Sequence, residues 1–328
     1  MKEKDSSFVN IRDEISASSR KRRENTDKFF RYSFLLAAII SAIMIILIFF
    51  FVGKKGIGPF LPSYGQAGGA SQQQNIFSFL TGMTWRPDQN PAVYGVGFII
   101  INTLVSAFLA AILAFPISVL SALFIVKVAP KKLRMFFTSV VELLAAIPSV
   151  VYGVFAAANI SSLVDNIAGL FGQSTHGGLS TLTVALLLAI MIYPTITSIA
   201  INAIAAVDKN IELGSLALGA SKTQTNFKLV LTAAKSGIFA GLILGLGRAF
   251  GEATAVSMVA GNAMVGPSFN LFDTTRTLTS TMLSGLHETS GIDYDIRFSV
   301  GIVLMIIVLI TNLSIQLVKR KIGGIANE

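Results

Sequence analysis

Six long apolar runs constrain this chain more than any other feature of its sequence. The hydrocarbon core of a bilayer is about 30 Å thick, so a spanning helix needs roughly 20 mostly apolar residues, and each run meets that length. Hydrophobic residues make up 53% of the sequence and charged residues 13%, with a mean hydropathy of +0.70. This balance excludes a disordered chain and an ordinary soluble domain. We predict an all-α polytopic membrane protein with six transmembrane helices, near residues 33–52, 94–126, 136–158, 179–207, 236–264 and 296–318.

The residue types exclude several kinds of site. The sequence has no cysteine, which rules out disulfides, thiolate metal sites and cysteine nucleophiles. Its two histidines, His176 and His287, lie far apart in sequence, so we expect this chain to bind neither a metal ion nor a cofactor. An intramembrane protease would need a Ser/His dyad or paired aspartates at membrane depth. Both histidines and four aspartates lie instead in predicted outside loops or at span ends: Asp165, Asp273, Asp293 and Asp295.

The distribution of Lys and Arg predicts the topology. If the N-terminus is cytoplasmic, 20 of the 26 basic residues fall in predicted inside segments, five fall outside, and Arg248 lies within the fifth span. Cytoplasmic loops carry such an excess of basic residues, so we place both termini in the cytoplasm. The formal net charge of +9 therefore indicates membrane topology and contact with anionic lipid, and no nucleic-acid partner.

These predictions divide the chain into parts. The first span is taken as an uncleaved anchor because its charged leader is long and no small-residue cleavage site follows it. The outside segment after it is rich in Gly, Pro, Ser and Gln, and either docks a partner or caps the bundle. The predicted parts are a basic cytoplasmic arm (1–32), the anchor helix (33–52), the outside segment (53–93), a five-helix core (94–318) with a cytoplasmic loop (208–234), and a cytoplasmic tail (319–328).

The fifth span carries the strongest functional pattern. At about 100° per residue, one stripe of this helix collects small residues, two charges and an amide: Gly237, Gly241, Gly245, Arg248, Glu252, Ala255, Val259 and Asn262. Glycines let a second backbone approach closely, and Arg248 and Glu252 are spaced for an ion pair. Charge at the bilayer centre costs at least about 2.5 kcal/mol per residue, so the stripe is expected to face the protein or an aqueous path. It is either part of a translocation path or gate that favours an anion, or a buried ion pair that fixes helix register.

The third span contains a proline in the stretch Glu142–Gly153. Pro148 removes a backbone donor and predicts a kink, whose freed backbone groups Ser149 or Tyr152 can satisfy. Glu142 lies about two turns from the predicted cytoplasmic end. The stretch is therefore a structural kink or, alternatively, a hinge in a gating helix.

The long inside loop predicts two short helices. Residues 212–219 are typical of a helix that ends at a glycine with positive φ, and Ser221 with Gln224 fits a capping box that starts a second helix through Leu231. Two short helices joined at a glycine form a compact protrusion that is suited to insertion into a groove of a partner protein. The alternative is that the loop is only a solvated connector between two spans. The loop is no P-loop, because Lys222 does not directly follow Gly219.

Together, these stretches resemble the permease subunits of bacterial ABC importers, specifically the phosphate permeases of the PstC type. Residues 142–153 and 247–262 closely resemble the signature of phosphate permeases, and the resemblance extends over about residues 94–321. It implies the ABC importer permease fold with a cytoplasmic coupling helix. The N-terminal arm and the outside Trp85-Arg86-Pro87 segment favour this subunit over its sister permease, PstA.

The inside loop resembles the cytoplasmic coupling motif EAA-x₃-G-x₉-I-x-L-P of these importers. When Gly219 is matched to the motif glycine, residues 213–215 occupy the EAA positions. Glu212 then precedes the usual acidic position by one residue, and Thr232 stands where the motif has proline. The resemblance implies a role in coupling to the ATPase for six residues: Glu212, Gly214, Ser215, Gly219, Ala220 and Ser221.

The resemblance also implies a function and partners. It indicates a permease for inorganic phosphate in the bacterial cytoplasmic (inner) membrane, paired with a second, PstA-like permease, two PstB-like ATPase subunits that use ATP and Mg²⁺, and a PstS-like binding protein. Arg248, Glu252 and Asn262 would belong to the path or gate, and Glu142, Pro148, Ser149 and Tyr152 to a kinked or gating helix. A permease for sulfate or molybdate, the PstA-type subunit and a non-transporting membrane scaffold are the alternatives.

Overall fold

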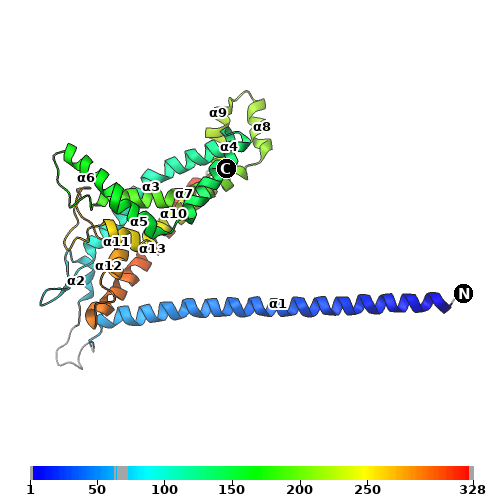
Figure 1. Cartoon of the computed structure of the whole chain (residues 1–328), viewed down its shortest axis with the longest axis horizontal. Helices are drawn as coiled ribbons and strands as arrows, with labels where there is room; N and C mark the ends of the chain where they lie inside the picture. The colour runs from blue at the N-terminus through cyan, green and yellow to red at the C-terminus, as the bar shows by residue number, and fades with distance from the viewer. Residues whose placement is uncertain (1–2, 63, 65–72, 325–328) are drawn as a thin grey trace. The chain divides into compact units, whose positions relative to one another are not determined.

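The computed structural model describes residues 3–62, 64 and 73–324, and most of them are helical (Figure 1). Six helical segments in this part of the chain are long and apolar enough to cross a membrane, which confirms the predicted number. They are Thr26–Phe60, Gly97–Val128, Ser149–Leu170, Thr181–Ala205, Lys222–Gly251 and Ile292–Leu317. The fold class is therefore the predicted all-α polytopic one.

The chain divides into two compact units. The first extends to Lys54 and consists of most of α1 (Glu3–Ile57), a continuous helix that includes the predicted anchor. The second unit begins at Lys55. Its elements are η1 (Gly58–Phe60), α2 (Ile76–Thr81), β1 (Trp85–Arg86), β2 (Val93–Tyr94), α3 (Gly97–Leu123), η3 (Phe124–Val128), α4 (Lys131–Ala146), α5 (Ser149–Phe155), η4 (Ala156–Ile160), α6 (Ser161–Leu170), α7 (Thr181–Ala205), α8 (Lys209–Ala217), α9 (Lys222–Gln224), η5 (Thr225–Val230), α10 (Leu231–Gly251), α11 (Thr254–Val259), α12 (Leu278–Leu283) and α13 (Ile292–Gly324).

The core of the second unit is built around α7. This helix packs most extensively against α3 and α10, and most of its side chains are buried, which fits its apolar character on all sides. On α3, the small residues Ala107, Ala110, Ala111 and Ala114 are buried in the same cluster. Small side chains of this kind allow close helix packing. α3 continues through Pro116 as one helix.

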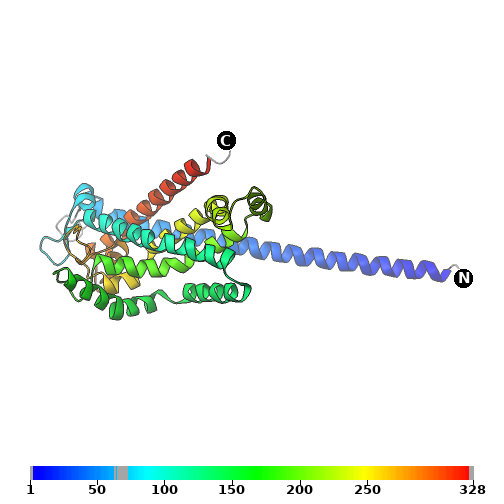
Figure 2. The same ribbon diagram turned by 90° about the horizontal axis from the view of Figure 1, so that it is seen from above.

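The loop of residues 208–234 is called the coupling loop because its sequence resembles the coupling motif. It lies at the opposite end of this unit from residues 73–93 of the outside segment. In Figures 1 and 2, α8 and α9 lie at one end, and α2 lies at the other together with the segment that precedes α3. The described part of the outside segment packs onto the helices there: Trp85 and Phe79 are buried in a cluster with Phe98, Leu278 and Ile296. β1 pairs with β2 in antiparallel register, and the Trp85 amide donates to the Met264 carbonyl oxygen at 2.8 Å.

The predicted bounds of the third span are wrong. The prediction began the span at Phe136 and ended it at Ala158, whereas the spanning segment is Ser149–Leu170. The helix before it, α4, ends at Ala146 and is a separate element. The prediction treated Pro148 as a kink within one helix, but the chain breaks there, because proline cannot donate to the preceding turn.

Candidate translocation path and coupling loop

The glycines of the fifth span face α7, as the stripe predicted. A Cβ atom on Gly245 would lie 2.7 Å from Cγ1 of Ile196, and one on Gly237 would lie 2.5 Å from Cβ of Ala203. A Cβ on Gly241 would lie 3.3 Å from the Ile196 carbonyl oxygen. These distances leave little or no room for a larger residue, so the glycines set how closely α10 approaches α7.

The predicted ion pair of the fifth span is not formed. α10 ends at Gly251, and Glu252 has an extended backbone (φ −76°, ψ 116°), so the stripe does not continue as one helix to Asn262. The Glu252 carboxylate accepts a hydrogen bond from the Ala255 amide at 3.0 Å, at the start of α11. Arg248 instead donates from Nη1 to Oγ1 of Thr195 on α7 at 3.1 Å. The prediction failed because the carboxylate satisfies a free amide at a new helix start, which an uninterrupted helix would not offer.

The break at Pro148 is bridged by a side chain, as predicted for Tyr152. Ile147 and Pro148 are extended, with ψ values of 128° and 140° between α4 and α5. The Tyr152 hydroxyl donates to the Leu144 carbonyl oxygen at 2.8 Å across the break. Ser149 begins α5 and is partly buried, whereas Glu142 is exposed on α4. The hydroxyl thus supplies the donor that the broken helix lacks.

The two signature stretches of the sequence meet in space. α5 packs on α11, and a Cβ on Gly153 would lie 2.9 Å from Cα of Ala255 and 2.8 Å from Sδ of Met258. Tyr152 on the same turn lies within electrostatic range of Arg248. The start of the third span and α11, just beyond the fifth span, therefore pack together, and Arg248 is near enough to Tyr152 to act on it electrostatically.

Asn262 occupies a special backbone position beyond α11. Its φ of 50° is the only positive value of a non-glycine residue in the described part of the chain, and its side-chain Oδ1 is buried without a hydrogen-bond partner. Its carbonyl oxygen accepts a hydrogen bond from Nη2 of Arg276 at 2.8 Å, and the Ala263 carbonyl accepts one from Nε at 2.7 Å. The structure therefore places Asn262 next to a buried arginine and not on the Arg248 helix.

Two buried arginines were missed by the sequence reasoning. Arg276 and Arg297 are each only 6% exposed. The Lys and Arg count assigned both to the outside, with Arg297 at the very start of the predicted sixth span, and such a count does not report burial. Burial and the nearby Arg297 lower the pKa of Arg276 to about 10. Arg297 donates to the Thr281 carbonyl oxygen at 2.7 Å. It also lines a cavity of about 350 Å³ whose walls include Gly251 and Ala253, on either side of Glu252.

The coupling loop folds largely as predicted. α8 is a short helix, and Gly219 follows it with a φ of 84°. Ser221 and Gln224 form a reciprocal capping box, and Ala220 donates its amide to the Ser215 carbonyl at 3.2 Å. The second helix is not short, however: α9 continues through η5 into α10 as the fifth span. The coupling loop is therefore joined rigidly to the helix that carries Arg248.

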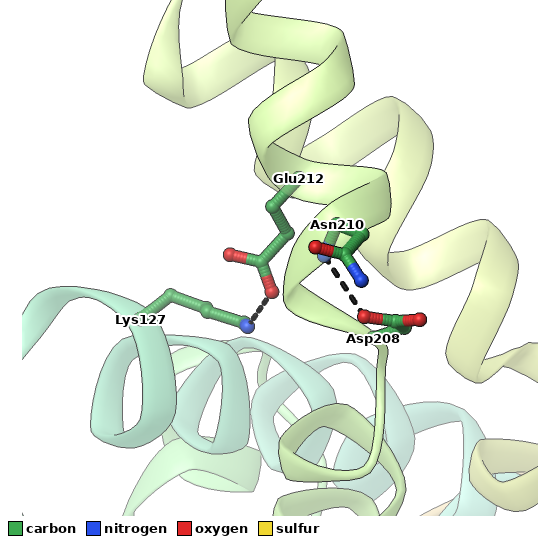
Figure 3. Close-up of polar contacts among 4 residues, drawn as sticks. All are labelled: Lys127, Asp208, Asn210 and Glu212. Carbon is green, nitrogen blue, oxygen red and sulfur yellow. Dashed lines mark hydrogen bonds and ion pairs between the residues drawn. The ribbon is translucent and has the colours of Figure 1, made fainter.

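Two side chains of α8 hold it against the rest of the unit. The Glu212 carboxylate forms an ion pair with Nζ of Lys127 in η3 (Figure 3), and the hydroxyls of Ser215 and Thr225 are 2.9 Å apart. Gly214 has open space around it. Apolar side chains face outward, with Leu218 90% exposed and Leu213 62% exposed.

The Arg248 guanidinium has the chemistry to bind an anion. Arg248 donates a hydrogen bond to the Thr195 hydroxyl, and no carboxylate in the described part of the chain forms an ion pair with it. Its remaining N–H groups can donate to an oxyanion. Within the described residues, no three His, Asp or Glu side chains gather closely enough to hold a metal ion.

Comparison with known proteins places the chain in a family. Residues 114–323 match the family described as binding-protein-dependent transport system inner membrane component. The chain is 35% identical to the probable ABC transporter permease protein YqgH of Bacillus subtilis, over 91% of this chain and 94% of that protein. It is 32% identical to the phosphate transport system permease protein PstC of Pasteurella multocida, over 75% of this chain and 82% of that protein.

Solved structures agree on the fold. A chain of a bacterial ABC transporter involved in the import of alginate matches with a TM-score of 0.57 at 19% identity, over 92% of this chain and 99% of that one. A chain of the MetNI methionine ABC transporter in an inward-facing conformation matches with a TM-score of 0.51 at 18% identity, over 68% and 94%. Because the family match covers most of the chain and its relatives align along nearly their full length, this protein belongs to the inner-membrane components of binding-protein-dependent transport systems and is a multi-pass permease of an ABC importer.

Proposed function

We propose that this permease carries inorganic phosphate across the bacterial cytoplasmic membrane as the PstC-type subunit of an ATP-driven importer. The observation that carries the proposal is Arg248, a half-buried guanidinium in the fifth span whose recorded partner is the neutral hydroxyl of Thr195. Arginine keeps its charge at any physiological pH, and charge within the bilayer costs free energy unless a counter-charge meets it. A passing oxyanion supplies that counter-charge. Phosphate is the specific anion because relatives at 30–32% identity are phosphate permeases.

The site supports a path that opens and closes. The backbone breaks at Glu252 and at Pro148 lie directly before α11 and α5, which pack against each other. A mostly apolar cavity of about 350 Å³ adjoins the first break and includes Arg297 in its lining. Half-helices and unwound backbone of this kind mark substrate sites in other transporters. Arg248 contacts the anion in transit without a tight clamp, because conduction requires release as well as binding.

The partners of the chain follow from the same proposal. A second, PstA-like permease completes the path, and a PstS-like protein delivers phosphate at the outer end. Two PstB-like ATPase subunits, which use ATP and Mg²⁺, dock on the coupling loop. The exposed Leu213 and Leu218 support this docking, since an apolar protruding helix fits a hydrophobic groove. Both termini and this loop then face the cytoplasm.

Uptake of labelled phosphate tests the function directly. Cells that lack the chain are compared with the same cells after its restoration as wild type, Arg248→Ala or Arg248→Lys. We expect Arg248→Ala to abolish uptake while the protein still inserts and co-purifies with its ATPase, and Arg248→Lys to retain part of it. Arg134→Ala is the matched control, because Arg134 is exposed on α4. Normal uptake by Arg248→Ala would refute a role of this residue in transport.

Competition identifies the anion, and labelling tests the topology. Excess unlabelled phosphate should suppress uptake, and suppression by sulfate or molybdate alone would assign a different oxyanion. The absence of cysteine from the chain allows single-cysteine labelling. In intact cells, an impermeant maleimide should label Ser78→Cys on α2 and leave Lys222→Cys on α9 unlabelled. The reverse pattern would invert the proposed orientation.

A further inference from the structure

The proposed function leaves unexplained the ion pair between Lys127 and Glu212. Glu212 stands one residue before the acidic position of the coupling motif, so the motif does not predict which group its carboxylate contacts. We infer that Lys127 and Glu212 form an internal link that transmits displacement of the coupling helix α8 to the second span. The inference rests on the proposed importer function and adds a positioning residue, Lys127, which no sequence pattern identified.

The geometry turns Glu212 inward. Its side chain is 21% exposed and that of Lys127 is 14% exposed, and Figure 3 shows the two pointing toward one another from α8 and η3. Asp208 caps the same helix by accepting from the Asn210 amide at 2.9 Å. The exposed residues of α8 and its C-cap include the apolar Leu213 and Leu218, whereas the Glu212 carboxylate contacts its own chain.

The pair connects two elements that otherwise have little contact. α8 is joined covalently to α7 through residues 206–208 and to the fifth span through the turn at Gly219. Its backbone packs mainly against η5. In the described part of the chain, the ion pair between Lys127 and Glu212 is a direct polar contact between α8 and the second span. Through it, a displaced α8 acts on three spans and not only on the two that it joins by peptide bonds.

Electrostatics makes this link resist separation. A partly buried pair is screened less by salt than an exposed pair, and removing one partner leaves the other charge without compensation in a poorly solvated place. Lys127 lies in a π-helical turn, where the Ala129 amide donates to the Phe124 carbonyl oxygen at 2.8 Å. π-turns are frequent at functional sites. Since this turn continues α3, which packs along α7, a pull on Lys127 reaches the centre of the bundle.

Charge reversal tests the link in the assembled importer, co-expressed with its partner subunits and reconstituted in liposomes. The measured quantity is labelled phosphate taken up per ATP hydrolysed. We expect Lys127→Glu and Glu212→Lys each to cause a loss of coupling, seen as a fall in this ratio, because each variant places two like charges at the contact. The double variant, K127E with E212K, restores an opposite-charge pair and should recover most of the ratio. Lys132→Glu is the control, since it makes the same charge change at an exposed position on α4, outside the coupling loop.

Unchanged coupling in both single variants, or no recovery in an assembled double variant, would overturn the inference. A carbodiimide supplies a second measurement that needs no destabilising variant. It activates the Glu212 carboxylate, and the Lys127 amine then forms an amide with net loss of water. Mass spectrometry of the wild-type importer should find the joined peptide, and Lys127→Arg should lack it while coupling normally. Absence of the cross-linked peptide from the wild type would refute the link. If the wild type gives the cross-linked peptide but does not transport phosphate, only the proposed substrate is refuted.

Discussion

Substitution of two neighbouring glycines in α10 tests the packing that positions Arg248. Gly245 faces α7: an added Cβ would lie 2.7 Å from Cγ1 and 2.9 Å from Cδ1 of Ile196, which is fully buried. Gly247 lies two residues further along the same helix, and an added Cβ there has nothing within 4 Å. The pair Gly245→Ala and Gly247→Ala therefore makes the same chemical change in a filled and in an open position.

The expected difference follows from two contributions to the free energy of unfolding. Replacing a helical glycine by alanine stabilises by about 0.5–1 kcal/mol at either position. Overpacking a filled interior costs about 1–3 kcal/mol, and this cost applies only at Gly245, because Ile196 has no free space to move into. Gly245→Ala should therefore be less stable than Gly247→Ala by about 1–3 kcal/mol.

The assay is the thermal unfolding midpoint of the purified permease in detergent, followed by circular dichroism. At roughly 2 °C per kcal/mol for a large domain, we expect Gly245→Ala to melt about 2–6 °C below Gly247→Ala. Gly245→Ala should also transport less, because a displaced α10 carries Arg248 away from Thr195. Equal midpoints for the two variants would show that the glycine stripe does not contact α7. A Gly247→Ala protein that melts below the wild type would show that its position is not open.

Two further predictions concern the ends of the molecule. Gly219→Pro should uncouple ATP hydrolysis from uptake, because proline cannot adopt the φ of 84° and lacks the amide that donates to the Leu216 carbonyl at 3.0 Å. Full coupling in assembled Gly219→Pro importers would contradict a role of the turn at Gly219 in coupling. At the other end, burial and a 2.9 Å hydrogen bond to Asp295 raise the pKa of Tyr64 to about 12. The folded state then keeps a proton that the unfolded state loses near pH 10, so this stabilisation is present below about pH 10 and is lost as the pH rises to 12. The tyrosinate absorbance difference between wild type and Tyr64→Phe should titrate near pH 12, and a midpoint near pH 10 would exclude the buried hydrogen bond.

Local signals in the sequence were sufficient for several features. The φ of Gly219 and the capping box of Ser221 with Gln224 depend on residues within four positions of each other, so their chemistry can be recognised without tertiary structure. The hydroxyl of Tyr152 was a predicted donor for the same reason: a proline break leaves acceptors without partners one to two turns away. The assignment of Arg248 to the path, of Glu142 to gating and of the loop residues to ATPase coupling stays a prediction.

The sequence by itself determined that this protein lies in a bilayer and how many times it crosses that bilayer. The length and apolarity of a spanning helix follow from bilayer thickness, which does not depend on how the helices pack. It also determined which side of α10 is small enough for close contact. Only the tertiary structure decided where each charge finds its partner. Glu252 turns to an amide of α11, Arg276 is buried in a predicted outside loop, and Arg297 is buried near the start of α13. Glu212 reaches Lys127 from 85 positions away in the chain. Charged side chains are long and pair with whatever the fold brings within a few ångströms, and the sequence does not record that proximity.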